Sequence, residues 1–443
     1  MGNPDRPKIL TAEDCKQVVI AISLLWMGSI AGAALAFLTQ VILARQLGPA
    51  EFGNISAALA AVTLCAPLAG FGVAQYWLKV FGEEGLEAKR WLPASFYLVG
   101  LSTLIVMSVL VCWAIYGPHD EQTRIISLVL SIYVIGQVSL ELVGGKLQLE
   151  ERYLALALWQ VLPHLTRFVV VLLLAFAFDQ LMNSENVVLA YAAIAGFLAV
   201  IGGVQMVSML TGHFDLKGHG HTKSLTMLET PVVLKVVSHA WPFGLAALFH
   251  LVYFQSDIIL LKYITGSEAA GIYNVAFTVM AVVLLLPSII YQKVLLPKMH
   301  RWSNYDHHRI IHVYRKGNIL MLVLGIMAML AIWGMAPSLM PILFGREYAG
   351  ATSLLNILAV CAPLLFVASS IGVTLVTQEK MKKKVKYMGV VAMLNIILNV
   401  ALIPAFGAIG AATATVLSNI VLVVIYRTAA QKYVLTVGLN KAI

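Results

Sequence analysis

The chain has 443 residues, of which 60% are apolar and only 12% are charged, and its mean hydropathy is +0.87. A soluble domain carries about 25% charged residues and could not bury so much apolar surface in its own interior. The composition therefore excludes a soluble globular enzyme and predicts an integral membrane protein. The net charge of +9 alone would suggest a nucleic-acid partner. We expect none, because the positions of the lysines and arginines follow membrane topology.

Twelve stretches reach the apolar length, about 20 residues, that a helix needs to cross the hydrocarbon core. They are 18–43, 52–78, 92–116, 125–147, 154–178, 187–210, 239–263, 271–292, 317–344, 353–377, 387–404 and 408–426. Each is expected to be a helix, because a span in lipid must satisfy its own backbone hydrogen bonds. The predicted fold class is an all-α polytopic membrane protein.

The positive charges indicate how these spans are oriented. With the N-terminus in the cytoplasm, 25 of the 30 lysines and arginines fall in cytoplasmic segments and four on the outer side. The remaining one, Arg167, lies in the fifth span. Cytoplasmic loops of membrane proteins carry an excess of Lys and Arg. Both termini are therefore predicted to be cytoplasmic.

The chain also contains an internal repeat. Four matches occur in consistent order: Gln40–Arg45 with Asp257–Lys262 at an offset of 217, Gly48 and Gly53 with Gly266 and Gly271 at 218, and Tyr116-Gly117 with Phe344-Gly345 and Glu151-Arg152 with Glu379-Lys380 at 228. They indicate duplication of a six-helix unit in the same orientation. We expect an N-terminal lobe at 1–210, a cytoplasmic linker at 211–238 and a C-terminal lobe at 239–443. Such repeats are typical of transporters with a site between two bundles near the midplane.

Four segments carry a family resemblance. They are LARQLGPAEFGN at 43–54, LQLEERYLALALWQ at 147–160, APSLMPILFGREYAGATSLLNIL at 336–358 and LNVALIPAFGAIGAATATVLSN at 398–419. They resemble bacterial polysaccharide flippases, the Wzx-like exporters of O-antigen and capsule, in the superfamily that includes the multidrug and toxin extruders.

The resemblance implies a protein of the bacterial inner membrane that is a transporter and not an enzyme. Its implied cargo is an oligosaccharide on a polyprenyl pyrophosphate carrier, moved by alternating access for O-antigen, capsule or exopolysaccharide synthesis. Membrane lipids and other polysaccharide assembly proteins are the implied partners. The alternatives are an ion-coupled drug antiporter and a membrane enzyme or scaffold of polysaccharide assembly.

Arg167 is the sharpest single signal within the predicted spans. A guanidinium at bilayer depth costs at least about 2.5–3.5 kcal/mol, so it should face protein or water and is a functional candidate by default. One interpretation is binding of pyrophosphate or an acidic sugar through its planar fork, with His164 one turn earlier on the same face. The other is an ion pair with Glu141, which is otherwise a candidate gate residue.

Asp257 and His250 in the seventh span are candidates for ion coupling. A membrane carboxylate near a water-filled cavity can titrate, which would suit a coupling proton or sodium ion. The alternative is a fixed salt bridge from Asp257 to Arg45 or Lys262. Those two cations are repeat equivalents, and they either snorkel to the interface or line the mouth of the substrate path. No other cofactor and no metal site is expected, since no ligand motif occurs.

Overall fold

The computed structural model describes residues 12–217, 231–288, 307–376 and 381–432, and every regular element in them is helical. The first half contains α1 (Ala12–Gly70), α2 (Val73–Glu84), η1 (Gly85–Trp91), α3 (Leu92–Tyr116), α4 (Glu121–Ser131), α5 (Tyr133–Leu149), α6 (Tyr153–Phe176), η2 (Asp179–Leu181) and α7 (Ser184–Leu210). The second half contains α8 (Val233–Ile264), α9 (Ser267–Ser288), α11 (His307–Phe344), η4 (Arg346–Tyr348), α12 (Ala351–Ala359), α13 (Cys361–Val376) and α14 (Met381–Ala430). The all-α prediction is confirmed. Residues 218–230 of the predicted linker lie outside the described residues.

Within the described ranges, nine helical stretches are long and apolar enough to cross a membrane. Two of them, Ser23–Tyr116 with 94 residues and Lys383–Ala430 with 48, are too long for a single crossing. A helix rises about 1.5 Å per residue, so a core about 30 Å thick takes up only about 20 residues. The chain is thus a multi-pass membrane protein. The lengths accommodate the expected twelve crossings, and that count stays a prediction.

Glycines with a positive φ divide the long stretches. Gly48 (φ 72°) breaks α1, and Gly407 (φ 57°) breaks α14. Both lie at the boundaries predicted between consecutive spans. Residues with a Cβ rarely adopt this backbone region, whereas glycine does so freely. The chain changes direction at each of these glycines, so α1 and α14 each consist of two consecutive helical arms.

A further break divides the range 52–78, which the hydropathy pattern predicts as one span. Phe71 and Gly72 both have positive φ, and they separate α1 from α2. A Cβ added to Gly72 would lie 2.4 Å from the backbone nitrogen of Gly244 in α8. The pattern does not reveal this break, because apolar residues continue through it and the packing partner is remote in sequence.

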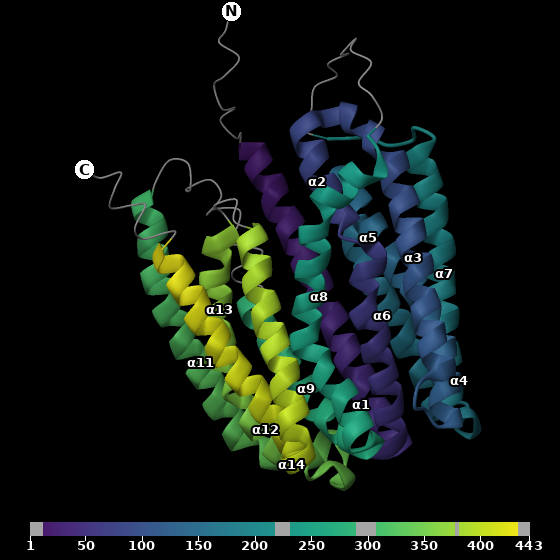
Figure 1. Ribbon diagram of the computed structural model, residues 1–443, viewed down its shortest axis with the longest axis vertical. Coiled ribbons are helices and arrows are strands. Elements are labelled where there is room, and N and C mark those ends of the chain that lie inside the picture. The colour runs from purple at the N-terminus through teal and green to yellow at the C-terminus, as the bar shows by residue number, and fades with distance from the viewer. Residues whose placement is uncertain (1–11, 218–230, 289–306, 377–380, 433–443) are drawn as a thin grey trace, which may run out of the picture.

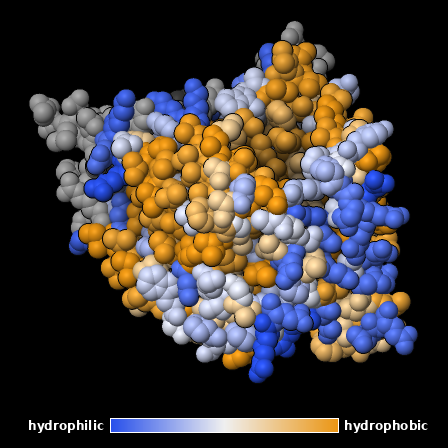
Figure 2. Space-filling model, turned by 60° about the horizontal axis from the view of Figure 1, so that its bottom comes forward, coloured by the Kyte–Doolittle hydropathy of each residue, from blue (hydrophilic) through white to orange (hydrophobic). Residues whose placement is uncertain are grey.

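Figure 1 shows α11 and α13 on one side of the molecule and α3, α4 and α7 on the other, with α1 and α8 between them. The start of α1 and the end of α14 lie toward the top of this view. We call the opposite end, which holds the turns at Gly48, 117–120, Gly266 and Gly345, the lower end. Large apolar side chains such as Tyr97 and Val200 are exposed, and Figure 2 shows wide apolar areas on the surface between polar ones. Lipid accounts for an apolar surface of this extent.

Candidate functional site

Arg167 lies in α6, and its guanidinium is placed over two aromatic rings. Its central carbon is 4.7 Å from the ring centroid of Tyr133 in α5 and 5.1 Å from that of Tyr191 in α7. Cation–π contacts of this kind stabilise a positive charge without an acid. The Nε atom is buried without a hydrogen-bond partner. Within the described part of the chain, Arg167 forms no salt bridge.

Glu141 points elsewhere. Gln75 of α2 donates a hydrogen bond of 2.9 Å to Glu141 Oε1. The other carboxylate oxygen faces Gly70, at 2.5 Å from where a Cβ would lie. Glu141 therefore contacts the break between α1 and α2. The alternative interpretation, an ion pair between Glu141 and Arg167, is therefore not formed in this structure.

His164 shares α6 with Arg167 but packs toward α1. Its Cδ2 atom lies 3.1 Å from the position of a Cβ on Gly32. A larger residue at position 32 would displace the imidazole. The structure thus assigns His164 a helix-packing contact with α1, one turn away from the guanidinium.

Asp257 lies in α8 with only 1% of its surface exposed. Its Oδ2 accepts hydrogen bonds from the hydroxyl groups of Tyr273 (2.5 Å) and Thr415. Its Oδ1 accepts one from Asn399 Nδ2 at 2.7 Å. These donors come from α9 and from both arms of α14. The carboxylate is therefore held by neutral groups on three helices.

The polar cluster continues beyond the carboxylate. Asn399 Nδ2 also donates to the carbonyl of Asn395 at 2.9 Å, and Ser256 Oγ donates to Asn395 Oδ1 at 3.0 Å. Asn399 Oδ1 is buried and has no hydrogen-bond partner in the described part of the chain. Among the residues that the structure describes, no salt bridge involves Asp257. The salt bridge to Arg45 or Lys262 is therefore not formed.

The chemistry of the Asp257 cluster suits a small cation. An unpaired buried carboxylate is costly unless it is protonated or has a cation beside it. One carboxylate with neutral oxygen atoms fits a proton or a hard monovalent ion better than a transition metal, which favours nitrogen and sulfur ligands. Within the described ranges, no group of three or more His, Cys, Asp or Glu residues could hold a metal ion.

His250 lies two turns before Asp257 on α8 but does not join this cluster. Its ring packs edge-on against Phe254, with 4.8 Å between the ring centroids. None of the hydrogen bonds of Asp257 reaches it. The structure thus separates the two candidates that the sequence grouped together.

Arg45 and Lys262 lie at the lower end, and each bonds to the other half of the chain. Arg45 in α1 donates from Nε to the carbonyl of Leu343 at 2.7 Å and from Nη2 to that of Ile342. Lys262 in α8 donates to Thr123 Oγ1 at 2.6 Å. The hydrogen bond from Thr123 and, to a smaller degree, the charge of Lys262 lower the pKa of the nearby Asp120 carboxyl.

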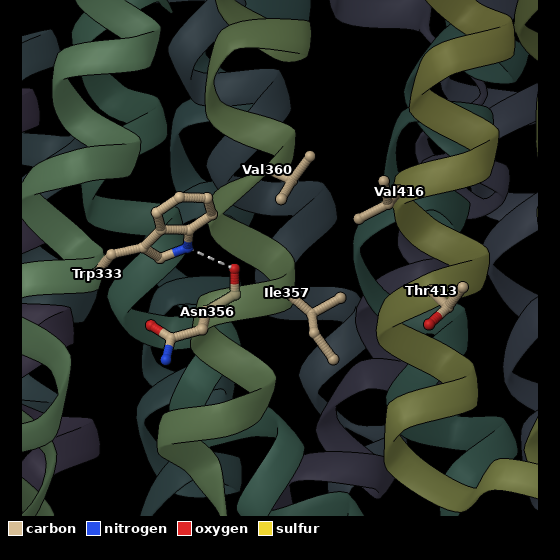
Figure 3. A pocket seen from close by; sticks show the side chains of 6 residues that line it. All are labelled: Trp333, Asn356, Ile357, Val360, Thr413 and Val416. Atoms are coloured by element: carbon tan, nitrogen blue, oxygen red, sulfur yellow. Dashed lines mark hydrogen bonds between the residues drawn. The ribbon is translucent and has the colours of Figure 1, made fainter.

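A separate groove of about 400 Å³ lies on the C-terminal half between α11, α12 and α14. Figure 3 shows its lining residues, with the Trp333 indole donating a 2.9 Å hydrogen bond to the carbonyl of Asn356. Ile357, Val360 and Val416 make most of the lining apolar. The groove contains none of the candidate residues.

The sequence profile of a family described as "Polysaccharide biosynthesis protein" matches residues 19–303. The chain is 26% identical over 403 residues to the probable low-salt glycan biosynthesis flippase Agl15 of Haloferax volcanii, covering 89% of this chain and 79% of that protein. It is 24% identical over 339 residues to the succinoglycan biosynthesis transport protein ExoT of Rhizobium meliloti, covering 75% and 63%.

Solved structures show the same fold. A lipid II flippase, MurJ, in an inward closed conformation aligns with a TM-score of 0.72 and 14% identity, covering 94% of this chain and 90% of that one. An inward-facing multidrug transporter of the MATE family aligns with a TM-score of 0.69 and 14% identity, covering 95% and 98%. The helical architecture is thus shared with transporters. Because the family profile spans well over half of the sequence, the chain belongs to the polysaccharide biosynthesis protein family.

Proposed function

We propose that this protein moves an oligosaccharide, carried on a polyprenyl pyrophosphate lipid, from the inner to the outer leaflet of the bacterial cytoplasmic membrane. Family membership supports this proposal, as do two relatives whose names describe a flippase and a transport protein of glycan synthesis. The observation that carries it is Arg167, a cation within the helical bundle that has no acid partner among the described residues.

The chemistry of Arg167 matches an anionic carrier lipid. Tyr133 and Tyr191 stabilise the charge through their rings, and the buried Nε atom has no hydrogen-bond partner among the described residues. A guanidinium presents up to five N–H donors in a planar fork, which fits a phosphate or carboxylate in bidentate geometry. In this proposal, Arg167 holds the pyrophosphate or an acidic sugar while the cargo crosses.

The Asp257 cluster is the proposed coupling site. Proton or sodium binding at Asp257 would neutralise the carboxylate and link the ion gradient to movement of α8 against α9 and α14. Tyr273, Asn399 and Thr415 would adjust their hydrogen bonds to the bound state. The two predicted lobes, 1–210 and 239–443, would move as bodies around the cargo.

The proposed orientation places both termini in the cytoplasm and the lower end outside. It rests on the charge bias, with 25 of 30 lysines and arginines on the side of the termini. Surface assembly proteins that receive the oligosaccharide would meet the transporter at the lower end.

Deletion of the gene in its own host tests the proposed function. Surface polysaccharide should disappear, and lipid-linked oligosaccharide should accumulate in the inner leaflet because its synthesis continues. Reintroduction of the gene should restore both. A deletion strain with normal surface polysaccharide but increased sensitivity to cationic drugs would instead support a drug antiporter.

A further inference from the structure

The two halves of the chain meet at the lower end through glycines that are repeat equivalents. The arm of α1 after Gly48 crosses α9 at Gly53 and Gly271, which are 218 residues apart. A Cβ on Gly53 would lie 1.8 Å from the carbonyl oxygen of Ser267, and one on Gly271 would lie 2.1 Å from that of Pro49. Pro49 and Ser267 are also 218 residues apart. Each half therefore makes the same contact with the other.

One helical turn further along α1 and α9, a hydrogen bond also joins two residues that are repeat equivalents. Asn274 Nδ2 donates to Ser56 Oγ at 2.8 Å, and these residues are again 218 apart. Both are buried, at 8% and 7% exposure. Contacts between equivalent residues are what an approximate two-fold axis through an interface produces. The axis therefore passes through this crossing of α1 and α9.

Two cationic contacts flank the crossing. Arg45 reaches from α1 to the carbonyl groups at the end of α11, and Lys262 reaches from α8 to Thr123 in α4. The two cations are repeat equivalents, and both bonds join opposite halves. Neither bond is a salt bridge to a carboxylate. The lower end is thus closed by backbone contact and hydrogen bonds, which can separate without leaving a buried unpaired acid.

We propose that Gly53, Gly271, Ser56 and Asn274 form a seal that closes the outer end of the transport path and opens each time cargo is released. Arg45 and Lys262 hold the two halves together beside this seal through their hydrogen bonds to the opposite half. The inference rests on the proposed alternating-access transport. Absence of a Cβ at positions 53 and 271 permits the close backbone approach, as small residues do between membrane helices.

A reversible cross-link tests whether the seal must open. Ser56→Cys and Asn274→Cys are combined in a background in which the four native cysteines are replaced. Oxidation should join the two helices and reduce oligosaccharide export to the level of the deletion strain, and a reductant should restore it. The matched control is Gln122→Cys with Ser184→Cys, whose side chains also hydrogen-bond (2.9 Å) at the lower end but within one half. Oxidation of the control should leave export unchanged. Full export by the oxidised 56–274 pair would overturn the proposal.

A cargo-independent measurement separates this inference from the proposed function. Gly271→Ala should hold the arms apart, because its methyl group cannot fit beside the Pro49 carbonyl. Ser56→Cys should then react several-fold faster with an impermeant thiol reagent in spheroplasts. Gly100→Ala, where a Cβ meets nothing within 4 Å, is the control. A faster reaction supports the seal whatever the cargo is, and equal rates in the two backgrounds would refute it.

Discussion

Arg167 and Asp257 show two ways of keeping a charged side chain inside a membrane protein. The guanidinium uses the faces of aromatic rings, whereas the carboxylate uses three hydrogen-bond donors. Neither uses an opposite charge from the described residues. A salt bridge would already neutralise each charge with another side chain. Without one, both residues can bind an ion of opposite charge that enters and leaves. This is why we propose a transport role for both residues.

Replacement of Arg167 should therefore affect transport before stability. Arg167→Ala removes no salt bridge among the described residues, so the protein should reach the membrane in normal amount while surface polysaccharide is lost. Arg167→Lys should restore part of the export, because it keeps the charge but not the bidentate fork. Immunoblots and polysaccharide staining measure the two effects.

The matched control addresses the ion-pair alternative. If Glu141 were the partner of Arg167, the Arg167→Ala protein would be destabilised by about 3–5 kcal/mol and its level would fall. Glu141→Gln would then rescue it. We expect no rescue, because Glu141 bonds to Gln75.

Asp257→Asn should abolish the dependence of export on the ion gradient. The amide has nearly the shape of the carboxylate but cannot carry its charge, and its NH₂ group faces donors. Thr415→Val should weaken the same dependence by removing one donor. Export is measured with the proton or sodium gradient collapsed.

Thr413→Val is the control, since among the described residues that hydroxyl donates to the carbonyl of Ile409 in its own helix and not to Asp257. Wild-type gradient dependence in Asp257→Asn would place the coupling site elsewhere.

At this scale, sequence reasoning finds the charged members of a site but not the neutral ones. Arg167 and Asp257 are visible because ionisable residues interrupt apolar runs. Tyr273, Asn399 and Thr415 carry no such signal, since each is an ordinary polar residue in a separate span. One sequence feature could point to them: Asn395 and Asn399 are four residues apart and so share a helix face. Likewise, the repeat identifies Arg45 and Lys262 as equivalents, but it does not predict which groups they hydrogen-bond, because those groups are distant in sequence.

At the scale of helices, hydropathy predicts where spans lie but not where they bend. The turns at Gly48 and Gly407 coincide with gaps in the apolar pattern, so hydropathy predicts a boundary between two spans at each of them. The break at Gly72 lies inside an apolar range and depends on α8, which is far away in sequence. Close packing against Gly244 accompanies this bend, and the hydropathy pattern gives no cue for it.

Gly72→Ala should therefore destabilise the protein. The substitution places a Cβ on a residue with a φ of 70° and 2.4 Å from the Gly244 nitrogen. Left-handed strain alone costs about 1–3 kcal/mol, so the melting temperature in detergent should fall clearly. Gly82→Ala in α2 meets nothing within 4 Å and should change stability by no more than about 1 kcal/mol, in the favourable direction. An unchanged melting temperature for Gly72→Ala would mean that the bend tolerates a side chain.

At the scale of the molecule, the repeat connects sequence to mechanism. An offset of 218 relates residues that meet across the lower end: Gly53 packs closely against α9 at Gly271, and Ser56 accepts a hydrogen bond from Asn274. An offset of 217 relates Arg45 and Lys262, and each of them bonds to a residue of the opposite half. A duplicated unit has two copies of the same surface, and their mutual contact is self-complementary. A symmetric seal is a direct consequence of such a duplication, and Asp257 breaks the symmetry because its equivalent is Gln40. The proposed coupling carboxylate therefore occurs in one half of the repeat and not in the other.

The orientation of the molecule decides which side the seal faces, and thiol labelling tests it. In the predicted topology, 25 of the 30 lysines and arginines lie on the same side as the N-terminus, so positive charge should keep that side in the cytoplasm. Asp179→Cys, exposed at the lower end, should react with an impermeant thiol reagent in spheroplasts. Glu83→Cys, exposed near the end of α2, should react only after the membrane is permeabilised. The reverse pattern would place the lower end in the cytoplasm, and the seal would then close the entry side of the transport path.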